Sequence, residues 1–430
     1  MAPSSARKEP RHYATRLPNG LTVATAEMPH MASVSLGLWI GVGSRCEPEK
    51  LSGASHMIEH MLFKGTRRRS ASEISQAVEG LGGYLNAFTS EEMTCFHAKA
   101  AHKHFRELLD VLMDMFLHSR FTPEDINKER EVIKEEMAMY LDEPQHQVQE
   151  LLNATLWPDQ PLGRPITGSS RSLDGITRPM LLAYLRERYL AGSAFLVAAG
   201  CISHQQVLRA ASSYAARFPA GDILPFAPVT EAQQAPVVRL LTKKSEQTQI
   251  ALGFRGCSRH DPRRHAVRVL NTVLGENMSS RLFQVVREDR GLAYSIYTSP
   301  SFFADTGDFV ISAGLDTDKL ESTLKLIMAE LRRIREKPPG VSELGRAIDY
   351  LIGQISVNLE GTEYQMNWLG EQLLGYDRTF APAQVKRRLA AVTAGEIRAA
   401  ARDLFRPERL NFTLVSPLKT DRHLHKLVRL

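Results

Sequence analysis

Apolar and polar positions follow one order twice along the chain. An apolar strand-like run at 34–40 precedes two helix-like segments, and the strand-like runs 84–89 and 94–98 come next, followed by a helix-like segment over 103–117. The second half repeats this order, with strand-like runs at 250–254, 293–298, 308–313 and 410–415 and helix-like segments at 265–274, 318–334 and 396–404. A repeat of roughly 200 residues indicates two duplicated domains, because solenoid units are much shorter.

The boundary between the two halves is predicted in a proline-rich stretch. Residues 218–236 contain four prolines and Gly221, a composition typical of an extended linker. We therefore expect an N-terminal domain at 1–217 and a C-terminal domain at 237–430. Strands and helices do not alternate strictly, and neighbouring strands are joined by short turns, so the pattern favours an α+β fold over a doubly wound parallel sheet.

Composition limits the class of protein. The 430 residues are 43% hydrophobic and 24% charged with a formal net charge of +6, which is ordinary for a globular protein. The short basic run Arg67–Arg69 is typical of a solvated loop, so no nucleic-acid partner is expected. No run approaches the ~20 apolar residues of a membrane-spanning helix, so no membrane partner is expected either.

The cysteines and the N-terminus bear on the compartment. Four cysteines (Cys46, Cys95, Cys201 and Cys257) are scattered without paired spacing, which favours free thiols in a reducing compartment. The segment Met1–His12 is basic and has no apolar core for secretion. We expect a bacterial cytoplasmic protein; the alternative is the mitochondrial matrix, if this segment is a short organellar leader.

The strongest chemical signal is the run His56-Met57-Ile58-Glu59-His60. Residues four apart share one face of a helix, so both imidazoles can close on one metal ion with Glu59 beside them. We expect Ser52 to cap this helix and Gly65 to end it. The run is the inverted form of a zinc-protease signature and indicates metal-assisted hydrolysis, although two surface histidines can produce the same five letters.

A catalytic zinc ion needs a third protein ligand. A helix is predicted from Pro123, with Thr122 as its cap, to a stop at Pro144. Within it, Glu129 and Glu136 are seven apart and share a face with Ile133 and Tyr140, which is unusual for a simple solvated stripe. Either carboxylate is therefore a candidate ligand.

Together these motifs make the chain resemble the pitrilysin or insulinase family of zinc metallopeptidases. The closest resemblance is to the subgroup of the mitochondrial processing peptidase β subunit and its bacterial relatives. Glu136 stands 76 positions after His60 (136 − 60), close to the spacing of about 75 residues at which the family's glutamate ligand follows. The resemblance implies one Zn²⁺ per chain bound by His56, His60 and Glu136, with Glu59 as the general base and Glu129 orienting a ligand.

The resemblance also implies how substrate binds. Asn86 and Ala87 match substrate-binding positions on an edge strand, and Arg287 and Tyr294 match a pair that contacts the substrate carbonyl and the developing oxyanion. Each domain is expected to be a mostly antiparallel sheet covered by helices, with the C-terminal domain free of metal.

The implied function is endopeptidase cleavage of extended, unfolded peptides or leader sequences inside a closed chamber. One chain would form half of that clamshell, so the expected partner is a second copy, or a related chain in a heterodimer. The alternative from another class is a non-catalytic core subunit of the same fold. Such subunits lack the zinc set, which this sequence contains in full.

Overall fold

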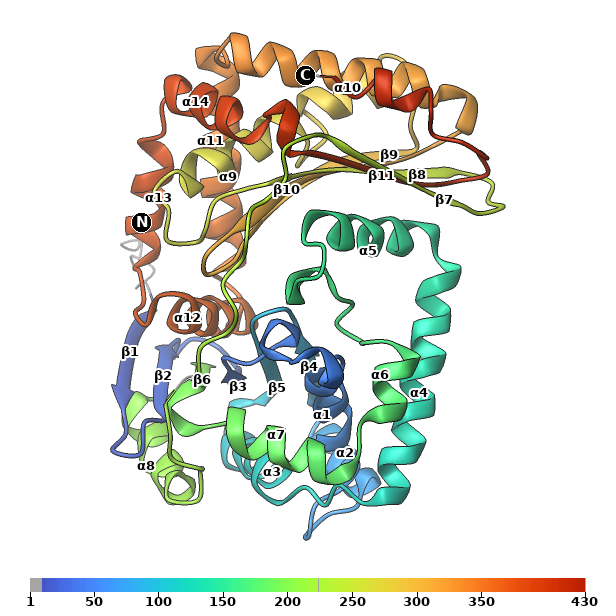
Figure 1. The fold of residues 1–430 in the computed structure, drawn as a ribbon. Helices are drawn as coiled ribbons and strands as arrows, with labels where there is room; N and C mark the ends of the chain where they lie inside the picture. Colours follow the sequence, from blue (N-terminus) through green and yellow to red (C-terminus); the bar gives the residue numbers. More distant parts are fainter. Residues whose placement is uncertain (1–9, 223, 430) are drawn as a thin grey trace, which may run out of the picture. The chain divides into compact units, whose positions relative to one another are not determined.

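The computed structural model describes residues 10–222 and 224–429, which form two compact units. Among these residues, the first unit comprises 10–134, 165–226 and 358–379, and the second comprises 135–164, 227–357 and 380–429. Each unit is built on one sheet with helices on its faces (Figure 1). The α+β class predicted from the sequence is confirmed. Residues 1–9, on which the prediction of a targeting leader depends, lie outside the described part.

The first unit contains a six-stranded sheet in the order β1-β2-β6-β3-β5-β4. The β2–β6 pair is parallel and the other pairs are antiparallel. β4 is paired only on one side, so it is an edge strand. The strands are β1 (Arg11–Arg16), β2 (Thr22–Glu27), β3 (Ser33–Ile40), β4 (Tyr84–Thr89), β5 (Thr94–Ala101) and β6 (Ala194–Gly200).

The helices of the first unit pack on the faces of this sheet (Figure 1). They are α1 (Ala54–Leu62), α2 (Ala71–Glu79), α3 (Phe105–His118), the first part of α4 (Pro123–Asp142), α6 (Ser170–Gly175), α7 (Arg178–Arg188), α8 (His204–Ala215) and α12 (Thr362–Tyr376). A capping box formed by Ser70 and Glu73 opens α2. On one face of the sheet, the Trp39 indole donates to the Met366 sulfur of α12.

The second unit contains a five-stranded sheet in the order β7-β11-β8-β10-β9, parallel only between β7 and β11. Its strands are β7 (Val237–Thr242), β8 (Thr248–Arg255), β9 (Ser295–Phe302), β10 (Gly307–Leu315) and β11 (Leu410–Ser416). Its helices are α5 (Pro144–Leu156), α9 (Arg264–Leu274), a π-helical turn at Phe283–Glu288, α10 (Leu320–Glu336), α11 (Val341–Asn358), α13 (Pro382–Ala390) and α14 (Ala394–Leu404).

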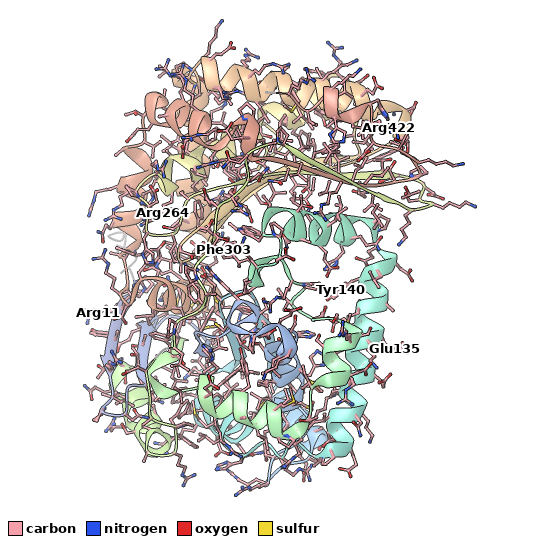
Figure 2. The ribbon with its side chains drawn as sticks, in the orientation of Figure 1. Arg11, Glu135, Tyr140, Arg264, Phe303 and Arg422 are labelled. Atoms are coloured by element: carbon pink, nitrogen blue, oxygen red, sulfur yellow. The ribbon has the colours of Figure 1, made fainter. Side chains whose placement is uncertain are left out.

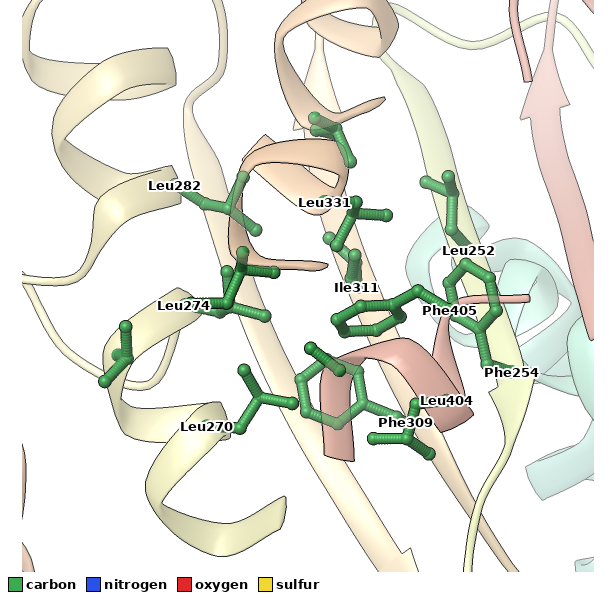
Figure 3. Close-up of a cluster of buried hydrophobic side chains, with 14 of the residues drawn as sticks. Leu252, Phe254, Leu270, Leu274, Leu282, Phe309, Ile311, Leu331, Leu404 and Phe405 are labelled. Carbon is green, nitrogen blue, oxygen red and sulfur yellow. The ribbon is translucent and has the colours of Figure 1, made fainter. Parts of the chain in front are cut away.

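Both faces of the second sheet are buried. On one face, Phe254 and Phe309 pack against Phe405 and the leucines of α9 and α10 (Figure 3). On the other, Leu152 of α5 packs beside Ala251. The central strands β10 and β11 are therefore buried along their whole length, including polar residues such as Asn411 and Thr413.

The units do not coincide with the two halves of the sequence. The predicted linker at 218–236 does contain a unit boundary, between Phe226 and Ala227. However, 135–164 belongs to the second unit and 358–379 to the first, so each half contributes one helix, α5 or α12, to the other half's sheet. Glycines allow the close packing: a side chain at Gly37 would collide with Met366, and one at Gly253 with Leu152. The prediction of domains at 1–217 and 237–430 does not include this exchange of α5 and α12 between the halves.

In the part of the chain that the structure describes, no helix has both the length and the apolar character needed to cross a bilayer. The four cysteines are free thiols, as expected from their scattered spacing.

Candidate metal centre

The histidine pair projects from one face of α1. His56 and His60 lie one turn apart, and their ring centroids are separated by 4.6 Å. His56 is buried, whereas His60 and Glu59 are half-buried. The helix predicted from this motif is therefore present, and it brings both imidazoles together.

The start of α1 differs from the sequence prediction. Ser52 does not cap the helix; Gly53 occupies the N-cap with a φ of 94°, a left-handed conformation that suits glycine. The carboxylate of Glu47, only 3% exposed, accepts hydrogen bonds from the N–H groups of Gly53 (2.7 Å) and Ser55 (2.6 Å). A buried negative charge thus satisfies the positive end of the helix that carries the histidines.

Glu129 contacts one of the histidines. Its Oε2 lies 3.1 Å from Nδ1 of His60, and its Oε1 lies 2.8 Å from Nζ of Lys64. A carboxylate oxygen accepts hydrogen bonds, so this contact favours the His60 tautomer with its proton on Nδ1, in which Nε2 is the metal-binding nitrogen. Glu129 is 4% exposed, and Lys64 offsets its charge.

Glu136 completes the cluster. α4 runs without a break across the division between Lys134 and Glu135, so the helix that carries Glu129 also carries Glu136, two turns later. One donor atom from each of His56, His60 and Glu136 lies within 4.8 Å of the other two. Among the described residues, this is the one such group of three histidine, cysteine or acidic side chains.

These residues fit a zinc ion. Two imidazoles and one carboxylate are a common catalytic zinc donor set, which leaves a fourth position open. Donor atoms on a tetrahedral zinc lie about 3.4 Å apart, and the three candidate donors here lie within 4.8 Å of one another. The structure thus selects Glu136 over Glu129 as the third ligand candidate.

Glu59 is linked to the edge strand. Its Oε2 accepts a 2.6 Å hydrogen bond from the hydroxyl of Thr89, the last residue of β4. A carboxylate held in this way, one residue from His60 on the same helix, has the position expected of a general base.

Asn86 and Ala87 lie on β4, as predicted. Asn86 is exposed and stands opposite His97 of β5, and its side-chain oxygen accepts from the N–H of Ala87 (2.8 Å). Because β4 is an edge strand, an extended peptide can add to its unpaired side through backbone hydrogen bonds.

Arg287 and Tyr294 belong to the second unit. Arg287 lies in the π-helical turn with its guanidinium 4.8 Å from the Phe283 ring centroid. Tyr294 immediately precedes β9 and is 56% exposed, and its hydroxyl donates to Asp316 (3.0 Å). That hydrogen bond raises the pKa of Tyr294.

Four residues around the centre were assigned no role from the sequence: Glu47, Lys64, Thr89 and Tyr140. The contacts made by Glu47, Lys64 and Thr89 join residues that are 6 to 65 positions apart in the sequence. No helical or strand periodicity predicts such contacts. Tyr140 had a signal, since it lies one turn beyond Glu136 on the same helical face, and its hydroxyl donates to Oε1 of Glu136 (2.7 Å).

Comparison with known families gives two matches that together cover most of the chain. Residues 22–170 match the model described as insulinase (peptidase family M16), and residues 175–351 match the peptidase M16 inactive domain. The first match contains the whole candidate centre. The second contains Arg287 and Tyr294.

Individual proteins are similar over nearly their full length. The chain is 39% identical over 411 residues to an uncharacterized zinc protease of Streptomyces coelicolor, covering 94% of this chain and 89% of the relative. It is 36% identical to the uncharacterized zinc protease YmxG of Bacillus subtilis, covering 93% and 97%. A protease from Helicobacter pylori has the same fold, with a TM-score of 0.89, 20% identity, and 95% and 100% of the two chains covered.

Proposed function

The chain belongs to the insulinase family of peptidases, M16, and from that premise we propose that it is a zinc-dependent endopeptidase that cleaves extended, unfolded peptides or leader sequences. The observation that carries the proposal is the cluster of His56, His60 and Glu136, whose donor atoms lie within 4.8 Å of one another. The intact donor set argues against the alternative, a non-catalytic core subunit of the same fold.

His56, His60 and Glu136 hold the metal in this proposal. A bound zinc ion would act as a Lewis acid and would lower the pKa of its bound water far below that of bulk water, towards ~7. Glu59 takes the proton from the attacking water and transfers it to the leaving amine nitrogen. Thr89 keeps Oε2 of Glu59 in place, and Glu129 keeps the proton of His60 on Nδ1.

The substrate binds as an added strand on β4. Its backbone pairs with the unpaired edge near Asn86 and Ala87, two to three residues before the Thr89 that contacts Glu59. Backbone pairing tolerates many side chains, so sequence specificity is loose. A segment whose backbone is already paired in a helix or sheet cannot pair with this edge, which favours unfolded segments as substrates.

The second unit acts on the substrate from a partner chain. We propose a homodimer, or a heterodimer with a related chain, in which Arg287 and Tyr294 reach the zinc site of the other protomer and stabilise the oxyanion. In the structure the Tyr294 hydroxyl donates to Asp316, so it must leave that carboxylate before it can donate to a substrate oxygen.

The decisive test is Glu59→Gln. The variant should bind zinc as the wild type does, because Glu59 is not among the three ligand candidates, and it should lose peptide cleavage by a factor of about 10³ or more. Cleavage is followed with a quenched-fluorescence peptide library, with and without chelator. The zinc content of each protein is measured by elemental analysis. Intact cleavage in a fully metal-loaded Glu59→Gln chain would refute the role of Glu59.

A further inference from the structure

Tyr140 makes a direct contact with the third ligand candidate. It lies four residues after Glu136 on α4, and its phenol donates a 2.7 Å hydrogen bond to Oε1 of that carboxylate. Figure 2 shows Tyr140 and Glu135 on different sides of α4, so the tyrosine is not part of the exposed stripe that contains Glu135. A phenol donates one proton, which here goes to Oε1 of Glu136.

The tyrosine ring is held from a second helix. The imidazole of His146, in the first turn of α5, stacks on it with centroids 4.2 Å apart and an interplanar angle of 11°. His146 Nδ1 in turn lies 3.9 Å from a carboxylate oxygen of Glu150. Since α4 ends at Asp142 and α5 begins at Pro144, the stack fixes the ring across the junction of the two helices.

From this arrangement we propose that Tyr140 is a positioning residue for the metal ligand Glu136, with His146 holding the tyrosine in place. The inference rests on the proposed metal site. A glutamate side chain has three rotatable bonds, and ordering it on metal binding costs conformational entropy. The phenol, bonded to Oε1 of Glu136, restricts these bonds before the metal binds.

The test measures zinc affinity, independently of activity. Tyr140→Phe removes only the hydroxyl, and we expect its zinc dissociation constant, measured by competition with a chromophoric chelator, to rise 10- to 100-fold. Tyr214→Phe is the matched control. Its hydroxyl donates to Asp110 (3.0 Å) and is likewise a phenol–carboxylate bond, but neither residue is a ligand candidate. That variant should bind zinc within twofold of the wild type.

His146→Leu separates positioning from general stability. It removes the stacked imidazole and keeps the Tyr140 hydroxyl, so the dissociation constant should rise less than in Tyr140→Phe, by about 3- to 10-fold. Absorption of the Co²⁺-substituted protein should change in Tyr140→Phe, because the phenol would no longer hold the Glu136 carboxylate.

The outcomes distinguish this inference from the proposed function. A wild-type chain that does not bind zinc refutes both. If the wild-type chain binds zinc and Tyr140→Phe has the same zinc affinity and the same Co²⁺ spectrum, only the positioning role is refuted. The same conclusion follows if Tyr140→Phe and Tyr214→Phe lose zinc affinity equally, because the effect would then be one of fold stability.

Discussion

The hydroxyl of Thr89 donates a 2.6 Å hydrogen bond to Oε2 of Glu59. The first residue ends the edge strand β4, and the second stands next to His60 on α1. One hydrogen bond therefore connects the strand proposed to pair with substrate to the proposed general base. Any shift of β4 relative to α1 would move the carboxylate that must meet the attacking water.

Thr89→Val removes this hydroxyl and keeps the side-chain shape. We expect kcat to fall about tenfold with KM and zinc content little changed, because Glu59 loses orientation while the metal ligands and the strand edge remain. Steady-state cleavage of a defined peptide measures both constants. The matched control is Thr242→Val on β7, which loses a 2.8 Å hydrogen bond to the carbonyl of Leu418. Equal losses in the two variants would contradict a specific role for Thr89.

Glu47→Ala should destabilise the fold around α1. The N–H groups of Gly53 and Ser55 would lose their buried acceptor, at a cost of roughly 1–3 kcal/mol each where water cannot replace it. Urea unfolding of the metal-free protein measures the change. Glu47→Gln retains one oxygen acceptor and should lose less, so a Gln variant as unstable as the Ala variant would count against this account.

The stability of the first unit should depend on pH through Asp110. Burial opposes ionisation, but hydrogen bonds from Arg68, Arg69 and Tyr214 outweigh it and lower the pKa of Asp110 to about 2 from 3.8. A folded-state pKa below the unfolded value means stabilisation that is complete above about pH 4 and is lost as the pH falls towards 2.

Asp110→Asn tests that dependence. The carboxylate is 27% exposed, so we expect the variant to lose roughly 1–2 kcal/mol of unfolding free energy at pH 7, less than the full shift implies. The gap between wild type and variant should stay constant down to about pH 4 and narrow below it. Urea unfolding of metal-free protein across this range measures the gap, and a gap that is constant down to pH 2 would contradict the assignment.

Local signals in the sequence predicted much of the first unit. The strand-like run predicted at 84–89 is the edge strand β4, and the helix-like segment predicted at 103–117 is α3. The spacing of His56 and His60 predicted their shared helical face, because 3.6 residues per turn determine it. For Glu129 and Glu136 the spacing predicted a shared face but left open which acid is the ligand.

What the sequence did not predict depends on contacts between distant segments. Ser52 has the chemistry of an N-cap, but the buried carboxylate of Glu47 satisfies that helix end in its place. Lys64 contacts Glu129 across 65 positions (129 − 64), and no periodicity reports such a pair. The exchange of α5 and α12 between the halves was missed for the same reason: both helices have ordinary patterns, and only tertiary packing decides which sheet each one covers.

The proposed sharing of sites between protomers predicts complementation. His60→Ala destroys the zinc set and Arg287→Ala removes the substrate contact, so each chain alone should be inactive. In co-expressed mixtures, half of the dimers are mixed, and each mixed dimer has one zinc site facing an intact Arg287. About a quarter of wild-type activity should therefore return. His60→Ala mixed with Glu59→Gln is the control, because both defects lie in the same half-site and no combination restores one. Native mass spectrometry shows whether His60→Ala and Arg287→Ala chains form mixed dimers. If these mixed dimers are present but inactive, the sites are not shared between protomers.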